Sequence, residues 1–310
     1  MPTILITDSL FIGPEEEAQI TAAGYTIERL DKPQASEDEL VDAVRDKVGY
    51  ILGGIETVTP RVIEAADSLK VIAFTGSGYK SFIPGWELAT RRGIAISAAT
   101  GENAQSVAEW AVISGLALVR NIPALTTDGG PSFYIAREIC GLTLGIVGLG
   151  HVGRATARLG QQLGFAILAT PASAPAGDGI ETVELNELLQ RADVIAIHVS
   201  EGRGDGVIDR AAFELIRPGS VLVNAAFEHA IDNEALIERV AGGTLRAAVD
   251  YSIAAEGLPP GALLSSNAQT AFNTADANAR ISHRATRSLL ELLSTGSNDD
   301  LVNPDFRSHR

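Results

Sequence analysis

Short apolar runs alternate with amphipathic, helix-like stretches along almost the whole chain of 310 residues. Parallel strands need long crossover connections, which are usually helices, so this alternation is typical of parallel sheets with helices on both faces. The runs form two series, separated by a longer helical pattern at 100–122. The sequence therefore predicts two doubly wound α/β units, with strands at 3–7, 25–30, 50–54, 70–74 and 94–98 in the first and at 142–148, 166–170, 194–199, 220–225 and 245–252 in the second.

The composition excludes several classes of protein. Hydrophobic residues make up 45% of the chain and charged residues 20%, which is ordinary for a globular protein. The formal net charge of −15 argues against nucleic acid or an anionic membrane as a partner, because both need a basic surface. Cys140 is the one cysteine, and the first residues lack the features of a signal peptide. No apolar run approaches the length of a membrane span, so we expect a cytoplasmic protein.

A glycine-rich motif follows the first strand of the second series. In LTLGIVGLGHVGRATARLG, a G-x-G-x-x-G pattern lies between a strand and a helix and consists of Gly148, Gly150 and Gly153. The first glycine permits a tight turn, the second admits a pyrophosphate against the backbone, and the third lets helix and strand pack closely. The helix N-terminus, with His151 and Val152, offers N–H groups and a partial positive charge to phosphates. The motif predicts a dinucleotide-binding domain.

The strand after this motif lacks one expected residue. Domains that bind NAD usually carry an acidic residue about 20 positions further on, where it bonds the ribose. Here the strand ends in Thr170 and Pro171. A hydroxyl can bond a ribose, but it does not repel a 2′-phosphate, and no arginine lies within 171–178 to attract one. We therefore expect NAD as the cofactor, with NADP as the open alternative.

Six segments resemble the D-2-hydroxyacid dehydrogenase family, and they occur in the family's order. They extend over nearly the whole chain and are KVIAFTGSGYKSFI, TGENAQSVAEWA, GIVGLGHVGRATA, ADVIAIHV, LIRPGSVLVNAA and LRAAVDY. The resemblance implies a Rossmann NAD(P)-binding domain at 100–282, inserted in a flavodoxin-like substrate domain that comprises 1–99 and 283–310. It also implies a cleft between the two domains and a homodimer, although the helical pattern at 100–122 fits either a bridge between domains or packing against a second subunit.

The resemblance also implies a catalytic set that this chain has changed. The family usually carries an arginine where Phe227 stands in VLVNAAFEHAID. A guanidinium holds a carboxylate by two bonds and stabilises a developing oxyanion, and a phenyl ring does neither. Gln269 aligns with the family's acid/base histidine, and an amide cannot exchange a proton near neutral pH. Glu256 is the nearest candidate for the carboxylate that orients this histidine, in a segment that departs from the family's pattern.

Other family positions are compatible with cofactor binding. The resemblance implies that Asp250 bonds the nicotinamide carboxamide, that Ala225 and Ala226 line the same ring, and that Ser106 lies near the nicotinamide-side phosphate. His198 ends an apolar strand, where it either packs in the core or flanks the cofactor. No His/Cys/Asp cluster has the spacing of metal ligands, so we expect no metal.

The loop after the run 70–74 is the implied anchor for the substrate. In the family, backbone N–H groups of this loop receive the substrate carboxylate, and here the loop consists of Gly76, Ser77 and Gly78. Tyr79 is compatible with the family, whereas Lys80 stands where an acidic residue is usual. With the arginine replaced, Lys80 is our candidate for the missing cation and for proton transfer; the alternative is a solvated lysine. His229 is a second, lower-ranked candidate for proton transfer.

Three functions fit these residues. We favour an NAD(P)-dependent oxidoreductase that acts on a small molecule other than a simple 2-keto or 2-hydroxy acid. The second is a redox-neutral lyase or isomerase that keeps NAD bound, and the third is a non-catalytic NAD(H)-binding regulator with a protein partner. Turnover without a net change in NADH absorbance would indicate the lyase or isomerase. Cofactor binding without turnover would indicate the regulator.

Overall fold

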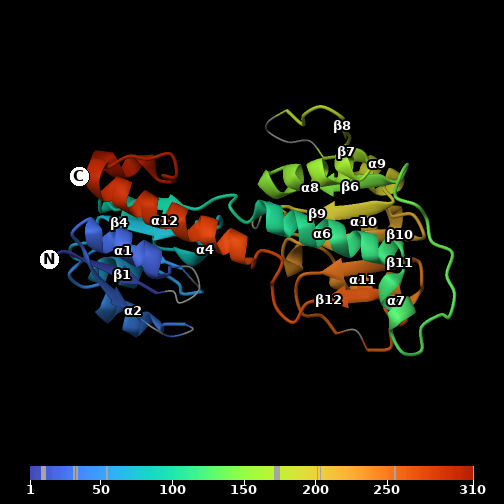
Figure 1. The fold of residues 1–310 in the computed structure, drawn as a ribbon, viewed down its shortest axis with the longest axis horizontal. Helices are drawn as coiled ribbons and strands as arrows, with labels where there is room; N and C mark the ends of the chain where they lie inside the picture. The colour runs from blue at the N-terminus through green and yellow to red at the C-terminus, as the bar shows by residue number, and fades with distance from the viewer. Residues whose placement is uncertain are drawn as a thin grey trace. The chain divides into compact units, whose positions relative to one another are not determined.

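The computed structural model describes residues 1–7, 12–30, 32, 34–53, 55–170, 175–200, 202, 204–254 and 256–309. The end of the predicted run 50–54 and Pro171 lie outside the described residues. The chain divides into two compact units, which we call unit 1 (Met1–Glu102 with Ala275–Arg310) and unit 2 (Asn103–Thr274). In Figure 1 the blue and red ends of the chain both belong to unit 1, and the green to orange middle forms unit 2.

Unit 1 contains a five-stranded parallel sheet in the order β2-β1-β3-β4-β5. This is the strand order of flavodoxin-like doubly wound folds. The strands are β1 (Thr3–Ile6), β2 (Thr26–Arg29), β3 (Lys47–Leu52), β4 (Val71–Phe74) and β5 (Ala95–Ala98). The helices are α1 (Pro14–Ala22), α2 (Glu37–Ala43), α3 (Pro60–Ala65), α4 (Tyr79–Phe82), α5 (Trp86–Arg91), α12 (Ala275–Thr295) and the 3-10 helix η2 (Pro304–His309).

Successive residues of each strand in unit 1 reach opposite faces of the sheet, which explains the all-apolar strands. On β1, Ile4 and Ile6 pack with Ile20 of α1 and Leu289 of α12. Leu5, between them, faces the other layer, where α2, α3 and α5 pack. Helix start signals are present in the sequence of unit 1: Ser36 and Glu39 form a reciprocal capping box at α2, and Pro14 and Pro60 occupy the first turns of α1 and α3.

Unit 2 contains a seven-stranded parallel sheet in the order β12-β11-β10-β9-β6-β7-β8. Read from β8, the order is 3-2-1-4-5-6 with one added strand, which is the Rossmann topology. The strands are β6 (Thr143–Val147), β7 (Ala166–Ala169), β8 (Ile180–Thr182), β9 (Val194–Ile197), β10 (Ser220–Asn224), β11 (Leu245–Val249) and β12 (Leu263–Ser265). The helices are α6 (Ala104–Val119), α7 (Ile122–Thr126), α8 (His151–Gln162), α9 (Leu185–Arg191), α10 (Arg210–Leu215), α11 (Asn233–Ala241) and the 3-10 helix η1 (Glu228–Ala230).

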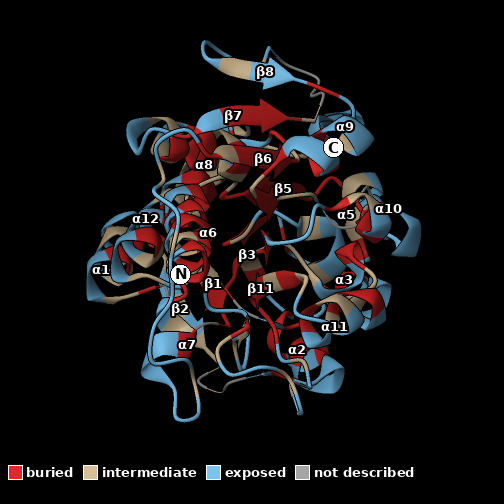
Figure 2. Ribbon diagram, turned by 90° about the vertical axis from the view of Figure 1, so that its right-hand side faces the viewer, coloured by how far each residue is buried: buried red, intermediate tan, exposed pale blue. Residues whose placement is uncertain are grey.

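The two faces of the unit 2 sheet bury separate clusters. Helices α6 and α8 cover one face through residues such as Leu118 and Ala157. Helices α9, α10 and α11 cover the other through Leu188, Phe213 and Leu236. Figure 2 shows most strand residues as buried, whereas the edge strand β8 is largely exposed. Among the described residues, no helix has both the length and the apolar character needed to cross a membrane.

The structure differs from the sequence prediction in four places. The helical pattern 100–122 is divided, because Asn121 adopts a left-handed conformation (φ 54°) between α6 and α7. Strands β8 and β12 were not predicted, since each has three residues and neither is fully buried. The predicted boundary at 282/283 falls inside α12, whose whole length packs in unit 1. The first junction lies at Glu102, three residues after the predicted one.

Candidate active site

The glycine motif forms the turn from β6 into α8. Gly148 has a φ of +100°, which favours glycine, and a Cβ there would lie 2.6 Å from the carbonyl oxygen of His198. A Cβ at Gly153 would lie 2.1 Å from the carbonyl oxygen of Gly148. Real Cβ atoms do not approach an oxygen so closely, so the turn and the helix packing both depend on glycine.

Gly150, at the N-cap of α8, has the opposite environment. A Cβ built there would meet no atom within 4 Å. Open space therefore faces the backbone where the first N–H groups of the helix, those of His151 and Val152, have no partner within the helix. A pyrophosphate fits this arrangement, because it needs both the free N–H groups and a backbone without a side chain. The residues present thus suit a dinucleotide.

Thr170 follows β7 and contacts the same turn. Its Oγ1 accepts a hydrogen bond from the N–H of Gly148 at 3.1 Å. The hydroxyl proton of Thr170 can then be donated to a ribose oxygen. Thr170 therefore holds the turn and offers a neutral ribose contact in place of a carboxylate.

His198 follows β9 and is hydrogen-bonded to α8. Its Nε2 lies 2.9 Å from Thr156 Oγ1, which donates its one proton to the carbonyl oxygen of Val152 at 3.0 Å. The Thr156 oxygen must then accept, so the imidazole proton lies on Nε2. Nδ1 is buried and has no hydrogen-bond partner among the described residues. Burial lowers the pKa of His198 to about 4, so the ring is neutral near pH 7 and unsuited to donate a proton.

Asp250 follows β11, and its buried carboxylate holds a neighbouring segment. It accepts hydrogen bonds from the N–H groups of Thr270 (3.0 and 3.1 Å) and Ala271 (2.9 Å), and from the Thr270 hydroxyl (3.2 Å). These contacts use most of the lone pairs of the carboxylate. The nicotinamide contact of Asp250 stays a prediction, and the structure adds a role as the anchor of the segment that carries Gln269.

Phe227 lies just after β10, on a backbone fixed by Asn224. The Asn224 amide donates to the carbonyl oxygen of Phe227 at 3.0 Å and accepts from the N–H of Ala226 at 3.0 Å. The phenyl ring is half-buried and packs against the core cluster beneath α10 and α11. It also stacks on His229, with ring centroids 4.4 Å apart. Ala225, also half-buried, packs against the opposite core cluster.

Gln269 is brought to this same strand end. Its side chain is exposed, and Nε2 donates to the carbonyl oxygen of Ala226 at 3.3 Å. Gln269 is therefore bonded to the residue next to Phe227, and these are the two positions that the resemblance aligns with the family's histidine and arginine. Glu256 lies exposed in a turn, and no hydrogen bond or ion pair joins it to Gln269 within the described part of the chain.

The substrate-loop candidates lie in unit 1, between β4 and α4. A Cβ at Gly76 would lie 2.7 Å from the ring of Phe74, so this position is sterically restricted. Ser77 Oγ accepts a hydrogen bond from the N–H of Gly101 at 3.4 Å, and Gly78 is the N-cap of α4. The loop is thus tied to the segment that follows β5.

Lys80 and Tyr79 both contact Trp86. The Lys80 ammonium lies 4.5 Å from the centroid of the Trp86 ring, which is a cation–π arrangement. Tyr79 meets the same ring edge-on, with centroids 6.2 Å apart, and burial raises the pKa of its hydroxyl. The sequence prediction of Lys80 as a substrate-binding cation did not include the contact with Trp86. Trp86 belongs to the next helix, and no spacing rule pairs the two residues.

Two further polar pairs occur near the candidate site of unit 2. Ser106 on α6 is buried, and its hydroxyl lies 2.7 Å from that of Thr274. His229 is exposed, with Nε2 3.5 Å from a carboxylate oxygen of Asp205, a residue that sequence reasoning did not single out. No group of three or more His, Cys, Asp or Glu side chains is placed to hold a metal in the part of the chain that the structure describes.

Comparisons with known proteins agree with this geometry. Residues 116–272 match the family model described as D-isomer specific 2-hydroxyacid dehydrogenase, NAD binding domain. A D-3-phosphoglycerate dehydrogenase of Mycobacterium tuberculosis is 33% identical over 259 residues, which cover 80% of this chain and 48% of that protein. A hydroxypyruvate reductase of Thermotoga maritima is 30% identical over 241 residues, which cover 76% of this chain and 75% of that protein.

A solved glyoxylate reductase from Paecilomyes thermophila superposes with a TM-score of 0.83 at 19% identity, covering 97% of this chain and 98% of that one, and so supports the fold. The chain spans about half the length of the D-3-phosphoglycerate dehydrogenases that it matches.

The predicted fold class and the predicted cofactor, NAD, are confirmed by the matched model and by the two parallel sheets. The family match covers about half of the chain and includes both the glycine motif and the segment from Phe227 to Gln269, and the chain belongs to the D-isomer specific 2-hydroxyacid dehydrogenase family.

Proposed function

We propose that this chain is an NAD-dependent oxidoreductase whose substrate is not a simple 2-keto or 2-hydroxy acid. The relatives named as dehydrogenases and reductases support the class of reaction. The observation that carries the choice of substrate is the contact between the strand end at Phe227 and the side chain of Gln269. Bound NAD would exchange a hydride with the substrate, and the residues of the chain would orient both molecules.

The side chains at this strand end suit a substrate with an apolar group beside its reacting carbon. Phe227 presents a half-buried ring that is already packed on one side, and such a surface does not compensate the desolvation of a carboxylate. Gln269 uses one amide N–H for the carbonyl oxygen of Ala226 and has a second N–H to donate. It can orient an oxygen or nitrogen of the substrate, but it cannot transfer a proton. A neutral carbonyl or imine compound fits these two groups.

A gain-of-function experiment tests this proposal. We expect Phe227→Arg combined with Gln269→His to raise kcat/KM for hydroxypyruvate, at saturating NADH, by at least about 100-fold over the unmodified chain. Loss of one oxyanion donor costs roughly 10²–10³ and loss of a general acid roughly 10²–10⁴, and the two effects need not multiply. The matched control is Phe227→Leu with Gln269→Asn, which should leave the rate low.

Two outcomes would change the assignment. Turnover of hydroxypyruvate by the unmodified chain at about 10 s⁻¹, the median for enzymes, would overturn the atypical substrate. Calorimetry that detects NADH binding, followed by no turnover with any carbonyl or imine compound, would favour a regulator. Turnover at constant NADH absorbance would favour a lyase or isomerase.

We further propose that the partner of this chain is a second copy of itself. Large apolar side chains are exposed along α6, α7 and the segment that follows in unit 2, and we call them the apolar group: Ile113, Ile122, Leu125, Phe133 and Ile135. Phe133 is 77% exposed and Ile135 81%. We infer that these exposed apolar side chains belong to an interface. The acidic net charge favours a protein over a nucleic acid as the partner.

A further inference from the structure

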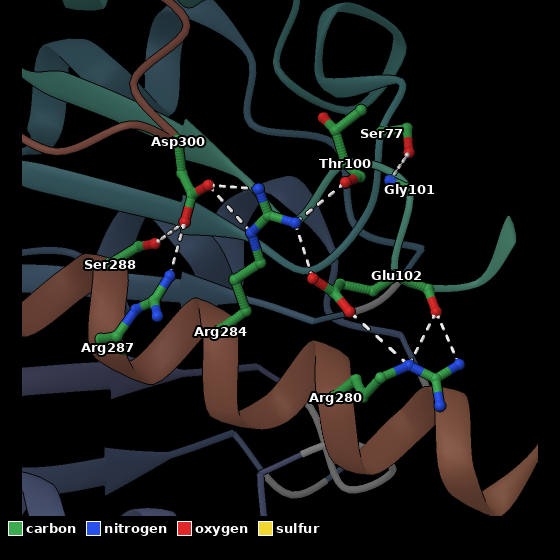
Figure 3. A network of polar contacts seen from close by, with 9 residues as sticks. All are labelled: Ser77, Thr100, Gly101, Glu102, Arg280, Arg284, Arg287, Ser288 and Asp300. Carbon is green, nitrogen blue, oxygen red and sulfur yellow. Dashed lines mark hydrogen bonds and ion pairs between the residues drawn. The ribbon is translucent and has the colours of Figure 1, made fainter. Parts of the chain in front are cut away.

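A network of charged side chains in unit 1 surrounds the three residues that follow β5, which we call the strap (Thr100, Gly101 and Glu102). The strap leads from unit 1 to α6, and the network joins it to α12 and to Asp300 near the C-terminus (Figure 3). None of these contacts belongs to the glycine motif or to the strand end at Phe227. Their purpose therefore needs a separate explanation.

Arg284 of α12 is the centre of this network. Its guanidinium donates to the carbonyl oxygen of Thr100 at 3.1 Å, to the carboxylate of Glu102 at 2.6 Å and to that of Asp300 at 2.8 Å. Arg280, one turn earlier, donates to the carbonyl oxygen of Glu102 at 2.9 Å and pairs with its carboxylate at 3.6 Å. The side chains and carbonyl groups of the strap are thus held by two arginines of one helix.

Asp300 fixes Arg284 from the other side. Its side chain is 2% exposed and accepts hydrogen bonds from Arg284 and from the hydroxyl of Ser288. Burial raises the pKa of Asp300, but the bonds from Arg284 and Ser288 outweigh burial and keep it below the usual value. The carboxylate therefore stays charged near neutral pH. The buried carboxylate therefore restricts the movement of the partly exposed Arg284 side chain.

The strap also contacts the loop Gly76–Ser77–Gly78. The N–H of Gly101 donates to the hydroxyl of Ser77 at 3.4 Å, and Gly101 has a φ of +86°, which favours glycine. The carbonyl oxygen of Gly78, at the end of the loop, accepts from the N–H of Ser81 in α4. A displacement of the strap would therefore be transmitted to Ser77 and to the start of α4.

We propose that Glu102 and Arg284 are positioning residues, which act through the Gly101–Ser77 hydrogen bond to set the conformation of the loop Gly76–Ser77–Gly78. The proposal rests on the proposed function and on the role that the family resemblance implies for this loop, whose N–H groups would bind a polar group of the substrate. To bind that group tightly, such N–H groups must lie within about 0.5 Å of their productive positions. The loop alone lacks the contacts for this accuracy, because Ser77 and Gly78 are exposed.

Hydrogen exchange on the full chain tests the link without any substrate. We expect Glu102→Ala and Ser77→Ala each to speed exchange of the Ser81 and Ile83 amides, which donate to carbonyl groups at the loop end, by about tenfold. The exchange rate of peptides from 143–153 in unit 2 should not change. Ser77→Thr, which keeps the hydroxyl, should restore slow exchange. The control is Arg287→Met. Arg287 lies on the same helix, but its ion pair with Asp300 is long (3.9 Å) and its side chain is half exposed.

The double variant Glu102→Ala with Ser77→Ala separates positioning from a general loss of stability. If the strap acts through Ser77, the double variant should exchange at the loop no faster than either single variant, because the two changes break one path. Additive effects, or faster exchange along α12 with an unchanged loop, would overturn the proposal. Unchanged exchange at residues 75–83 in Glu102→Ala would do the same.

A kinetic measurement gives the functional readout. In the Phe227→Arg, Gln269→His background, we expect Glu102→Ala to raise KM for hydroxypyruvate by about tenfold, to change kcat by less than about threefold and to leave NADH affinity unchanged. A lower kcat with an unchanged KM would contradict positioning of a binding loop. If that background shows no turnover, the proposed function fails, while the exchange experiment still decides whether the strap positions the loop.

Discussion

At the scale of single residues, the glycine motif contains two glycines with different tasks. A methyl group at Gly153 would overlap the carbonyl oxygen of Gly148, whereas one at Gly150 would enter open space. We expect Gly153→Ala to lower the free energy of unfolding by about 1–3 kcal/mol, because the helix must shift. Gly150→Ala should cost less than about 1 kcal/mol in stability and weaken NADH binding by at least about tenfold. Urea unfolding and calorimetry on both variants measure the two effects.

Two results would contradict these expectations for Gly150 and Gly153. If Gly150→Ala bound NADH as tightly as the unmodified chain, the open space beside the helix N-terminus would not be the pyrophosphate site. Equal stability of Gly153→Ala and the unmodified chain would show that the overlap with Gly148 relaxes without cost.

Single residues also show what a sequence can and cannot predict. Gly148, Gly150 and Gly153 are recognisable because their tasks are local and their spacing is fixed by one turn. The partner of Lys80, the ring of Trp86, is not recognisable, because it depends on how two short helices pack. The same holds for Asp250, whose carboxylate binds Thr270 and Ala271 about 20 residues further along the chain. The glycine motif is therefore predictable from spacing, whereas the partners of Lys80 and Asp250 depend on how the chain folds.

At the scale of elements, the burial of the His198 ring, which follows β9 and contacts Thr156 of α8, predicts a pH dependence. Folded His198 has a pKa of about 4, whereas an unfolded histidine has one of about 6.5. Between these values the unfolded chain binds a proton that the folded chain excludes, so the free energy of unfolding should fall as the pH falls. The expected loss between pH 7.5 and pH 5 is about 2 kcal/mol, with no contribution from His198 above pH 7.5.

Urea unfolding at pH 7.5, 6 and 5 measures this loss. His198→Gln should reduce the slope, because the amide carries no titratable proton and can still donate to Thr156. His283→Gln is the control, since His283 is exposed on α12. An equal slope in His198→Gln and the unmodified chain would mean that other groups cause the pH dependence.

Elements were predictable where their signals are strong. The capping box at Ser36 fixed the start of α2, and the all-apolar runs fixed the inner strands. Strands β8 and β12 were not predicted, because a three-residue edge strand shows no periodic pattern and little burial. The end of α6 was not predicted, because Asn121 interrupts a pattern that is apolar on both sides.

At the scale of the whole molecule, the apolar group in unit 2 predicts a homodimer. Sedimentation equilibrium should give about twice the chain mass of 32.5 kDa. Phe133→Ser with Ile135→Ser should shift the equilibrium towards the monomer, because both side chains lose apolar area that a partner would cover. Ile55→Ser is the control, because Ile55 is an exposed apolar position (57%) in unit 1. A monomer in the unmodified chain at micromolar concentration would contradict the proposal.

The nested order of the two units has a consequence for how such a gene can be rearranged. Unit 2 is one uninterrupted stretch, whereas unit 1 consists of two pieces. Within unit 1, Glu102 at the end of the first piece pairs with Arg280 near the start of the second at 3.6 Å. Ala275, where the second piece begins, lies about 7–8 Å from Arg280 along the axis of α12. A linker of a few residues could therefore close unit 1 into a continuous protein, and the excised stretch could be transplanted as a self-contained nucleotide module without cutting a strand of either sheet.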